Sequence, residues 1–218
     1  MELLRDRSAS NVFDCFGMPR LLAARTDNWN WFMAHLGNGV EYGLHCLLWL
    51  VDAGTEAASS RDLADLQGIS PSFLAKIFPK LEKAGIVRAS EGIRGGYLLA
   101  RPADQITVLD VVDAIEGKKP LFDCQQIRRK CAVFGRTAPR WSSEGVCAIH
   151  AVMLRAEQSM RTELANTTIA ALAGAVDRKA PANFAGEVRE WLSRRVDMRE
   201  TARRTGTTEA KTARSRAS

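Results

Sequence analysis

Long apolar runs are missing from the sequence. The longest, LHCLLWLV from Leu44 to Val51, is interrupted by His45 and falls far short of the roughly 18 residues that a membrane-spanning helix needs. No pattern of a secretory signal is visible, and five cysteines are an odd number for a disulfide framework. We therefore expect a soluble, cytoplasmic protein without a membrane partner, whose cysteines are reduced thiols or metal ligands.

Signatures of catalysis are missing as well. The sequence contains no P-loop, no dinucleotide-binding fingerprint and no nucleophile paired with a general base. These absences predict a protein that is not an enzyme and that takes no small-molecule substrate.

Net positive charge is small outside the C-terminal end. The net charge is +6, and residues 198–218 hold six Lys and Arg against two Glu. Because this segment lacks apolar side chains that could pack, we expect a disordered basic tail. Residues 1–36 show no sustained periodicity and are expected to form a flexible extension, with Met33 as an alternative start. A contact with DNA must then come from local clusters of cations.

Two helices are predicted at the start of the central region. In VEYGLHCLLWLVDA, residues 40–53, apolar side chains recur at the spacing of an amphipathic helix. Ser59 or Ser60 can cap the next helix, SRDLADLQ, and Gly68 ends it.

A third helix follows a tight turn, which completes a helix-turn-helix. Ser70 precedes it and Pro71 occupies its first turn, where proline is well tolerated. Ser72, Lys76 and Lys80 are expected to point outward, so that these residues and Ser70 face the bases or phosphates of double-stranded DNA. The residues expected to pack inward are Phe73, Leu74, Ile77, Phe78 and Leu81.

A small β-wing is predicted next. IVRAS and GYLLA have the composition of strands, and EGIRGG between them supplies a glycine turn with Arg94 at its tip. Arg94 is expected to enter the minor groove of DNA. With a helix from Thr107 to Glu116, residues 37–117 form a winged helix-turn-helix domain.

The rest of the chain carries the late cysteines and a long apolar stripe. Cys124 and Cys131 lie in an irregular loop, residues 118–146, which we expect to bind a metal or cluster. Within residues 147–197 a long helix presents apolar residues on one face and is suited to form a homodimer, and shorter helices close the fold. The predicted fold is mainly α with a small β-wing.

These motifs occur together in one known family. VEYGLHCLLWL, ISPSFLAKIFPKLEKAGIV, RGGYLLARP, ITVLDVVDAIEG, the cysteine loop, CAIHAV and TTIAAL follow the order seen in the Rrf family of bacterial winged-helix regulators, which includes IscR, NsrR and RsrR. The chain resembles this family over roughly residues 38–175, with RsrR as the nearest type. The resemblance implies a dimeric transcriptional regulator, expected to be a repressor, whose operator affinity depends on an iron-sulfur cluster, expected to be [2Fe-2S].

The resemblance offers two ligand sets for this cluster. In the RsrR-like set, Glu41 and His45 of one subunit join Cys124 and Cys147 of the other. Residues four apart share one helix face, so the Glu41 and His45 side chains can reach the same metal. We favour this set.

In the IscR-like set, three cysteines and a histidine bind the cluster, and these would be Cys124, Cys131, Cys147 and His150. The gap between Cys131 and Cys147 is longer than that pattern expects. Cys46, on the apolar first helix, is interpreted as a core residue rather than a ligand.

Two other functions remain open. A regulator without a cluster could use Cys124, Cys131 or Cys147 to form a disulfide on oxidation. A winged-helix interaction module could instead be stabilised by zinc, although structural zinc sites prefer cysteines two to four residues apart.

Overall fold

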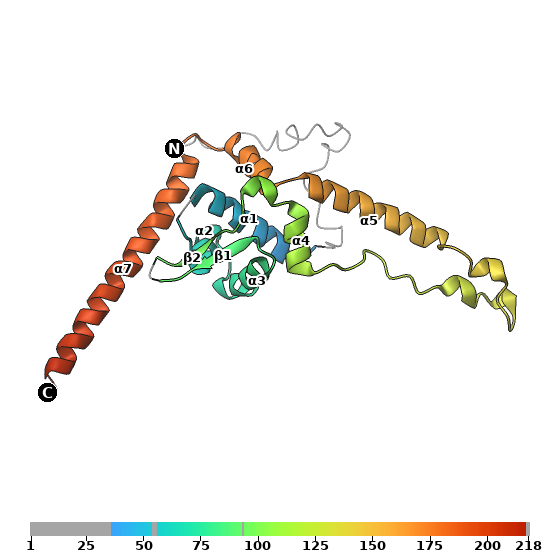
Figure 1. Cartoon of the computed structure of the whole chain (residues 1–218), viewed down its shortest axis with the longest axis horizontal. Helices are drawn as coiled ribbons and strands as arrows, with labels where there is room; N and C mark the ends of the chain where they lie inside the picture. Colours follow the sequence, from blue (N-terminus) through green and yellow to red (C-terminus); the bar gives the residue numbers. More distant parts are fainter. Residues whose placement is uncertain (1–35, 54–55, 93, 217–218) are drawn as a thin grey trace, which may run out of the picture. The chain divides into compact units, whose positions relative to one another are not determined.

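The computed structural model describes residues 36–53, 56–92 and 94–216. The predicted extension and Met33 lie outside these residues, apart from Leu36. The elements, in chain order (Figure 1), are α1 (Asn38–Ala53), α2 (Ser60–Gln67), α3 (Pro71–Lys83), β1 (Val87–Ser90), β2 (Gly96–Leu99), η3 (Ala103–Gln105), α4 (Val108–Glu116), η4 (Ile127–Lys130), η5 (Ala132–Phe134), η6 (Arg140–Ser142), α5 (Ala148–Asn166), α6 (Ile169–Asp177) and α7 (Phe184–Arg216). The prediction of a mainly α fold with a small β-wing is confirmed.

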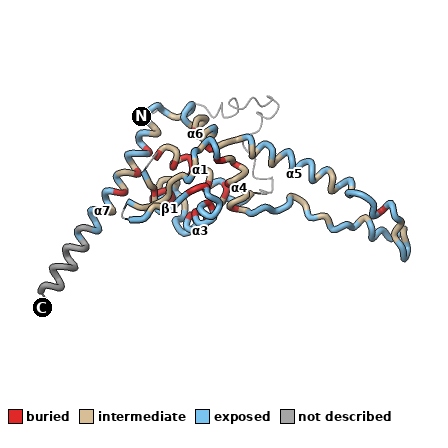
Figure 2. Tube along the Cα trace, in the orientation of Figure 1, coloured by how far each residue is buried: buried red, intermediate tan, exposed pale blue. Residues whose placement is uncertain are grey.

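Helix α1 is at the centre of the core. It contacts α2, α3, α4, α6, α7 and β2, and buried residues gather along it (Figure 2). A Cβ atom on Gly43 would lie 2.6 Å from Ile115 Cδ1 and 3.7 Å from Ile77 Cγ2, so a glycine lets α1 approach both α4 and α3. Cys46 is fully buried, as predicted for a core residue, and burial raises the pKa of its thiol to about 12.

Capping residues set the helix boundaries that the sequence predicted. The Ser59 hydroxyl accepts the Asp62 N–H at 3.1 Å at the start of α2, and Gly68 ends that helix with φ +70°. At the start of α4, Thr107 and Asp110 form a reciprocal capping box.

The wing is a two-stranded antiparallel sheet with Val87 opposite Leu99 and Ser90 opposite Gly96. Glycine is required beside the turn, because a Cβ on Gly95 would lie 2.4 Å from the Ser90 carbonyl oxygen. An isolated bridge between Ala58 and Tyr97 joins the wing to the segment before α2. The wing and the helix-turn-helix therefore form one packed unit.

Helix α5 has no buried residue along its 19 positions (Figure 2). It is attached to α4 by Arg161, whose guanidinium donates to the two carboxylate oxygens of Asp113 at 2.9 and 2.7 Å. Among the described residues, no helix is both long and apolar enough to cross a membrane.

Helix α7 differs from the sequence prediction of a disordered tail at residues 198–218. Its first part buries Val188, Leu192 and Val196, and the helix continues through the predicted tail to Arg216. At the start of the tail, Arg199 binds Asp62 of α2 and Glu200 binds Arg94 of the wing. The composition of the tail did not reveal these contacts.

Candidate functional site

Helix α3, the second helix of the helix-turn-helix, exposes the polar face that the sequence predicted. Ser72 and Lys76 are exposed, whereas Leu74 and Ile77 on the opposite face are buried. The hydroxyls of Ser70 and Ser72 lie 2.8 Å apart at the helix N-terminus, where backbone N–H groups favour phosphate oxygens. The prediction that Phe73 packs inward is wrong in part, because the residue is 39% exposed, and its ring makes a T-shaped contact with the ring of Tyr42 at 5.4 Å between centroids.

Lys80 makes a contact inside the protein. Its Nζ donates to the Ile115 carbonyl oxygen at 2.8 Å, near the C-terminus of α4. A cation at this end of a helix stabilises carbonyl groups that lack partners within the helix. The DNA contact of Lys80 stays a prediction, and in the free protein its ammonium joins α3 to α4.

The wing-tip arginine is already paired in the free protein. Arg94 donates from Nε to Glu200 Oε1 and from Nη2 to Glu200 Oε2, both at 3.2 Å, and Nη2 lies 3.4 Å from Asp197 Oδ1. These contacts raise the pKa of Arg94, chiefly through the hydrogen bond to Glu200. The guanidinium binds the Glu200 carboxylate in bidentate fashion, through the same pair of donors that can bind a phosphate.

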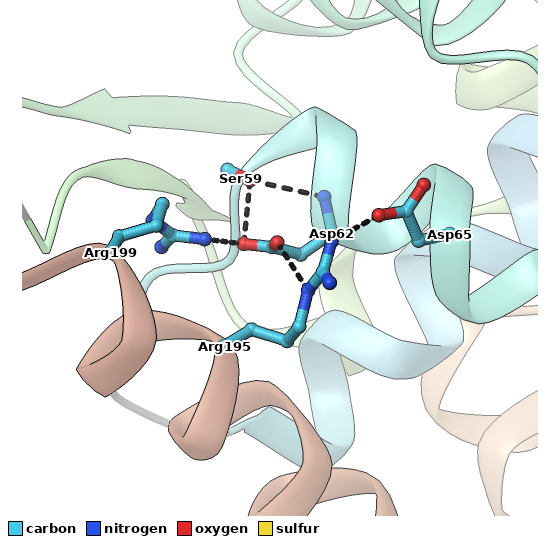
Figure 3. Close-up of polar contacts among 5 residues, drawn as sticks. All are labelled: Ser59, Asp62, Asp65, Arg195 and Arg199. Carbon is cyan, nitrogen blue, oxygen red and sulfur yellow. Dashed lines mark hydrogen bonds and ion pairs between the residues drawn. The ribbon is translucent and has the colours of Figure 1, made fainter. Parts of the chain in front are cut away.

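A buried aspartate holds α7 against α2 (Figure 3). Arg195 Nε donates to Asp62 Oδ1 at 3.1 Å, and Arg199 binds the other oxygen of the same carboxylate. Arg195 also pairs with Asp65, on the next turn of α2. The Ser59 hydroxyl donates to Asp62 Oδ2 at 2.6 Å, so the cap of α2 and the attachment of α7 share one carboxylate.

Sequence reasoning missed this group, and nothing in the sequence could have paired its members. Asp62 is separated from Arg195 by 133 residues and from Arg199 by 137. Arginine and aspartate are common surface residues, and their spacing within α2 and α7 is equally typical of solvated helix faces. The available signal was the apolar spacing of WLSRRV, which predicts a packed helix there.

Two of the predicted ligands, Cys124 and Cys147, lie together. The pKa of the Cys147 thiol is lowered, mainly by the backbone N–H groups of His150 and Ile149 at the start of α5, and further by Arg128 and the neighbouring Cys124 thiol. A helix N-terminus and a nearby cation stabilise a thiolate, the form in which cysteine binds iron. This arrangement suits ligation.

The other two residues of the IscR-like set differ in their surroundings. Cys131 is exposed in the loop, and the His150 ring lies 6.0 Å from the ring of Phe122. Arg128 holds the end of the same loop through the carbonyl oxygens of Glu144 and Gly145, at 3.1 and 2.6 Å.

Glu41 and His45 are both exposed on α1 and line one pocket of about 290 Å³ between α1 and α6. The remaining wall is mostly apolar and consists of Leu44, Leu48, Leu172, Ala175, Val176 and Lys179. His45 is therefore not a core residue and can be reached from outside the chain.

The structure does not join the two pairs within one chain. In the described part of the protein, no three His, Cys, Asp or Glu side chains converge closely enough to hold a metal. Neither ligand set is therefore assembled by one subunit alone.

Comparison with known proteins decides the family. Residues 36–175 match the profile of Rrf2, described as an iron-dependent transcriptional regulator. The chain belongs to the Rrf2 family. The protein rrf2 of Nitratidesulfovibrio vulgaris is 34% identical over 132 residues, which cover 60% of this chain and 81% of that protein. The HTH-type transcriptional regulator IscR of Cereibacter sphaeroides is 39% identical over 80 residues, 34% of this chain and 52% of the relative.

A solved structure supports the fold of this Rrf2-family chain. CymR, the global cysteine regulator of B. subtilis, superposes with a TM-score of 0.51 at 21% identity and covers 66% of this chain and 98% of its own. The protein is thus a DNA-binding transcriptional regulator with a winged-helix fold, and its relatives are regulators rather than enzymes. These relatives do not show a special closeness to RsrR. The family match ends at residue 175, before α7 begins.

Proposed function

We propose that this Rrf2-family regulator is a homodimeric repressor whose operator affinity is controlled by a [2Fe-2S] cluster. Glu41 and His45 of one subunit and Cys124 and Cys147 of the other would hold the cluster. The observation that carries the proposal is that the Cys124 and Cys147 thiols lie side by side and that the pKa of the Cys147 thiol is lowered. When bound, such a cluster supplies reversible one-electron chemistry, and histidine and carboxylate ligands favour a higher potential than four thiolates.

The dimer contact is assigned to α5. Ile149, Val152 and Leu154 are large apolar residues that this helix leaves exposed. A second copy of the chain would cover them and remove their apolar surface from water. Dimerisation through α5 would also let Cys147 at its start, with the neighbouring Cys124, meet Glu41 and His45 of a second copy.

A change in cluster ligation at Glu41 and His45 would alter DNA binding through α1. These residues share that helix with Gly43, and the close approach of Gly43 to α3 and α4 couples α1 to the recognition helix. In a dimer, ligands shared between subunits would fix the separation of the two recognition helices, which must match successive major grooves about 34 Å apart. Ser70, Ser72 and Lys76 would contact the groove, and Arg94 would exchange its carboxylate partners for DNA.

Anaerobic purification followed by iron, sulfide and zinc analysis tests the proposal. We expect a brown protein that contains iron and sulfide, and a change in operator affinity in gel-shift titrations when the cluster is removed. A reporter gene behind the operator should be derepressed when the regulator is deleted. A colourless protein that takes up no iron on reconstitution would contradict cluster control, and a zinc-loaded protein without DNA affinity would support the interaction-module alternative.

A thiol switch is the second candidate, and the adjacency of Cys124 and Cys147 favours it specifically. Oxidation would remove two electrons and two protons from the two thiols, and peroxide would accept them and form two molecules of water. Mass spectrometry after peroxide treatment should then find a disulfide between Cys124 and Cys147 in the iron-free protein. DNA affinity that responds to peroxide without any bound iron would favour this candidate over the cluster.

A further inference from the structure

The domain that reads DNA is acidic. Residues 37–117 contain seven Lys and Arg against eleven Asp and Glu. Double-stranded DNA carries one negative charge per about 1.7 Å of its axis, so the net charge of this domain opposes binding, and cations outside the domain would add to the local attraction of Lys76 and Arg94.

The C-terminal segment carries much of the missing positive charge. Residues 201–218 contain five Lys and Arg against one Glu, so they account for four of the six net charges of the chain. The loop 118–146 is also basic, with seven Lys and Arg against two acids. Arg128 and Arg140 of that loop, however, bind partners within it.

Described contacts place α7 beside the DNA-reading elements. Asp62 of α2 binds Arg195 and Arg199 (Figure 3), and Arg94 at the wing tip binds Glu200. The basic segment starts at the next residue. Sixteen residues of α7 follow Glu200, and at 1.5 Å per residue they extend about 24 Å along the helix axis.

Composition limits what this segment can bind. After Met198 alanine is the only apolar residue type, so the helix offers no apolar face to a protein groove or to a membrane interior. A polyanion requires only charge and hydrogen-bond donors, which arginine and lysine supply.

We propose that α7 beyond Glu200 is an additional DNA contact, which binds the phosphates that flank the site of the wing. The proposal rests on the proposed function, because it takes the wing to lie against DNA. The contact is independent of base sequence, so it raises affinity for operator and non-operator DNA alike. It also lies outside the part of the chain that defines the family.

The test compares three full-length proteins on a mixed-sequence duplex of 40 base pairs. The tail variant carries Arg204→Gln, Lys211→Gln, Arg214→Gln and Arg216→Gln. The control variant removes the same charge from the loop, through Lys118→Gln, Lys119→Gln, Arg129→Gln and Lys130→Gln. Dissociation constants are measured between 50 and 200 mM salt, and the melting temperatures of the variants check that the fold is unchanged.

The slope of log affinity against log salt reports how many phosphates the protein neutralises, at about 0.9 for each phosphate. We expect the tail variant to lower the magnitude of the slope by about 2 or more, to weaken binding by about tenfold at 50 mM salt, and to exceed the loop variant in both effects. An unchanged slope, or an equal reduction in both variants, would overturn the proposal. Arg94→Ala in the same assay separates the wing contact from the contact of α7. Unchanged DNA binding in this variant would count against the wing contact, whereas the salt slope of the tail variant still tests the contact of α7.

Discussion

Asp62 holds α7 in place, and its replacement by asparagine has a cost that can be worked out from burial. The carboxylate is 4% exposed, whereas Arg195 and Arg199 are 31% and 33% exposed. Removal of one partner from a fully buried ion pair costs about 3–5 kcal/mol. Because both guanidinium groups can be partly hydrated here, we expect Asp62→Asn to lower the free energy of unfolding by about 2–3 kcal/mol.

Urea denaturation measures this effect. The free energy of unfolding of a protein of this size falls by about 2 kcal/mol per molar urea, so the urea concentration at the unfolding midpoint should fall by roughly 1 M. Asp65→Asn is the matched control, because the Asp65 carboxylate lies on the same helix, pairs with Arg195 and is 38% exposed. This change should cost less than about 1 kcal/mol. If Asp62→Asn destabilises no more than Asp65→Asn, the buried carboxylate does not hold α7.

Three further outcomes follow from described contacts. Gly43→Ala should destabilise the fold by about 1–3 kcal/mol in the same denaturation assay, because its Cβ would come within 2.6 Å of a side chain of α4; an unchanged midpoint would show that α1 and α4 can separate freely. Asp197→Asn combined with Glu200→Gln should tighten DNA binding several-fold in gel shifts, since these two acids bind Arg94 and would compete with DNA for it under the proposed wing contact. The gain should shrink in an Arg94→Ala background, and an equal gain in both backgrounds would indicate general repulsion instead. Alkylation of Cys147 in the iron-free protein should reach half its maximal rate at a lower pH than an unperturbed thiol, because its lowered pKa leaves more thiolate at any given pH; a midpoint at or above that of a model thiol would contradict this.

Local signals made much of the winged-helix domain predictable. Ser59, Gly68 and Thr107 act through backbone groups within four residues of themselves, so their capping roles can be read from neighbouring sequence. The wing followed from glycines between two β-prone segments, where backbone crowding admits no side chain.

Long-range contacts explain what could not be predicted. The first residues of the predicted tail, Arg199 and Glu200, have their partners on α2 and on the wing, more than 100 residues away. A charged segment poor in apolar residues looks disordered when its partners are unknown. Likewise, the outward direction of Lys80 was predictable, but its bond to the Ile115 carbonyl required the packing of α3 on α4.

The candidate site was predicted in parts. The adjacency of Cys124 and Cys147 across the loop agrees with membership of both ligand sets, and the i, i+4 spacing of Glu41 and His45 places both on one pocket. Under the proposed function the two pairs combine only in a dimer, so their arrangement depends on a second copy of the chain, which neither the sequence nor a single chain contains.

Iron content of a mixed dimer tests the shared ligand set most directly. Subunits with His45→Ala are combined with subunits with Cys147→Ala, and the heterodimer and both parent homodimers are reconstituted anaerobically. The shared site predicts no cluster in either parent and half of the wild-type iron in the heterodimer, because one of its two sites keeps all four ligands. A heterodimer without iron, or a His45→Ala homodimer with its full complement of iron, would contradict the account.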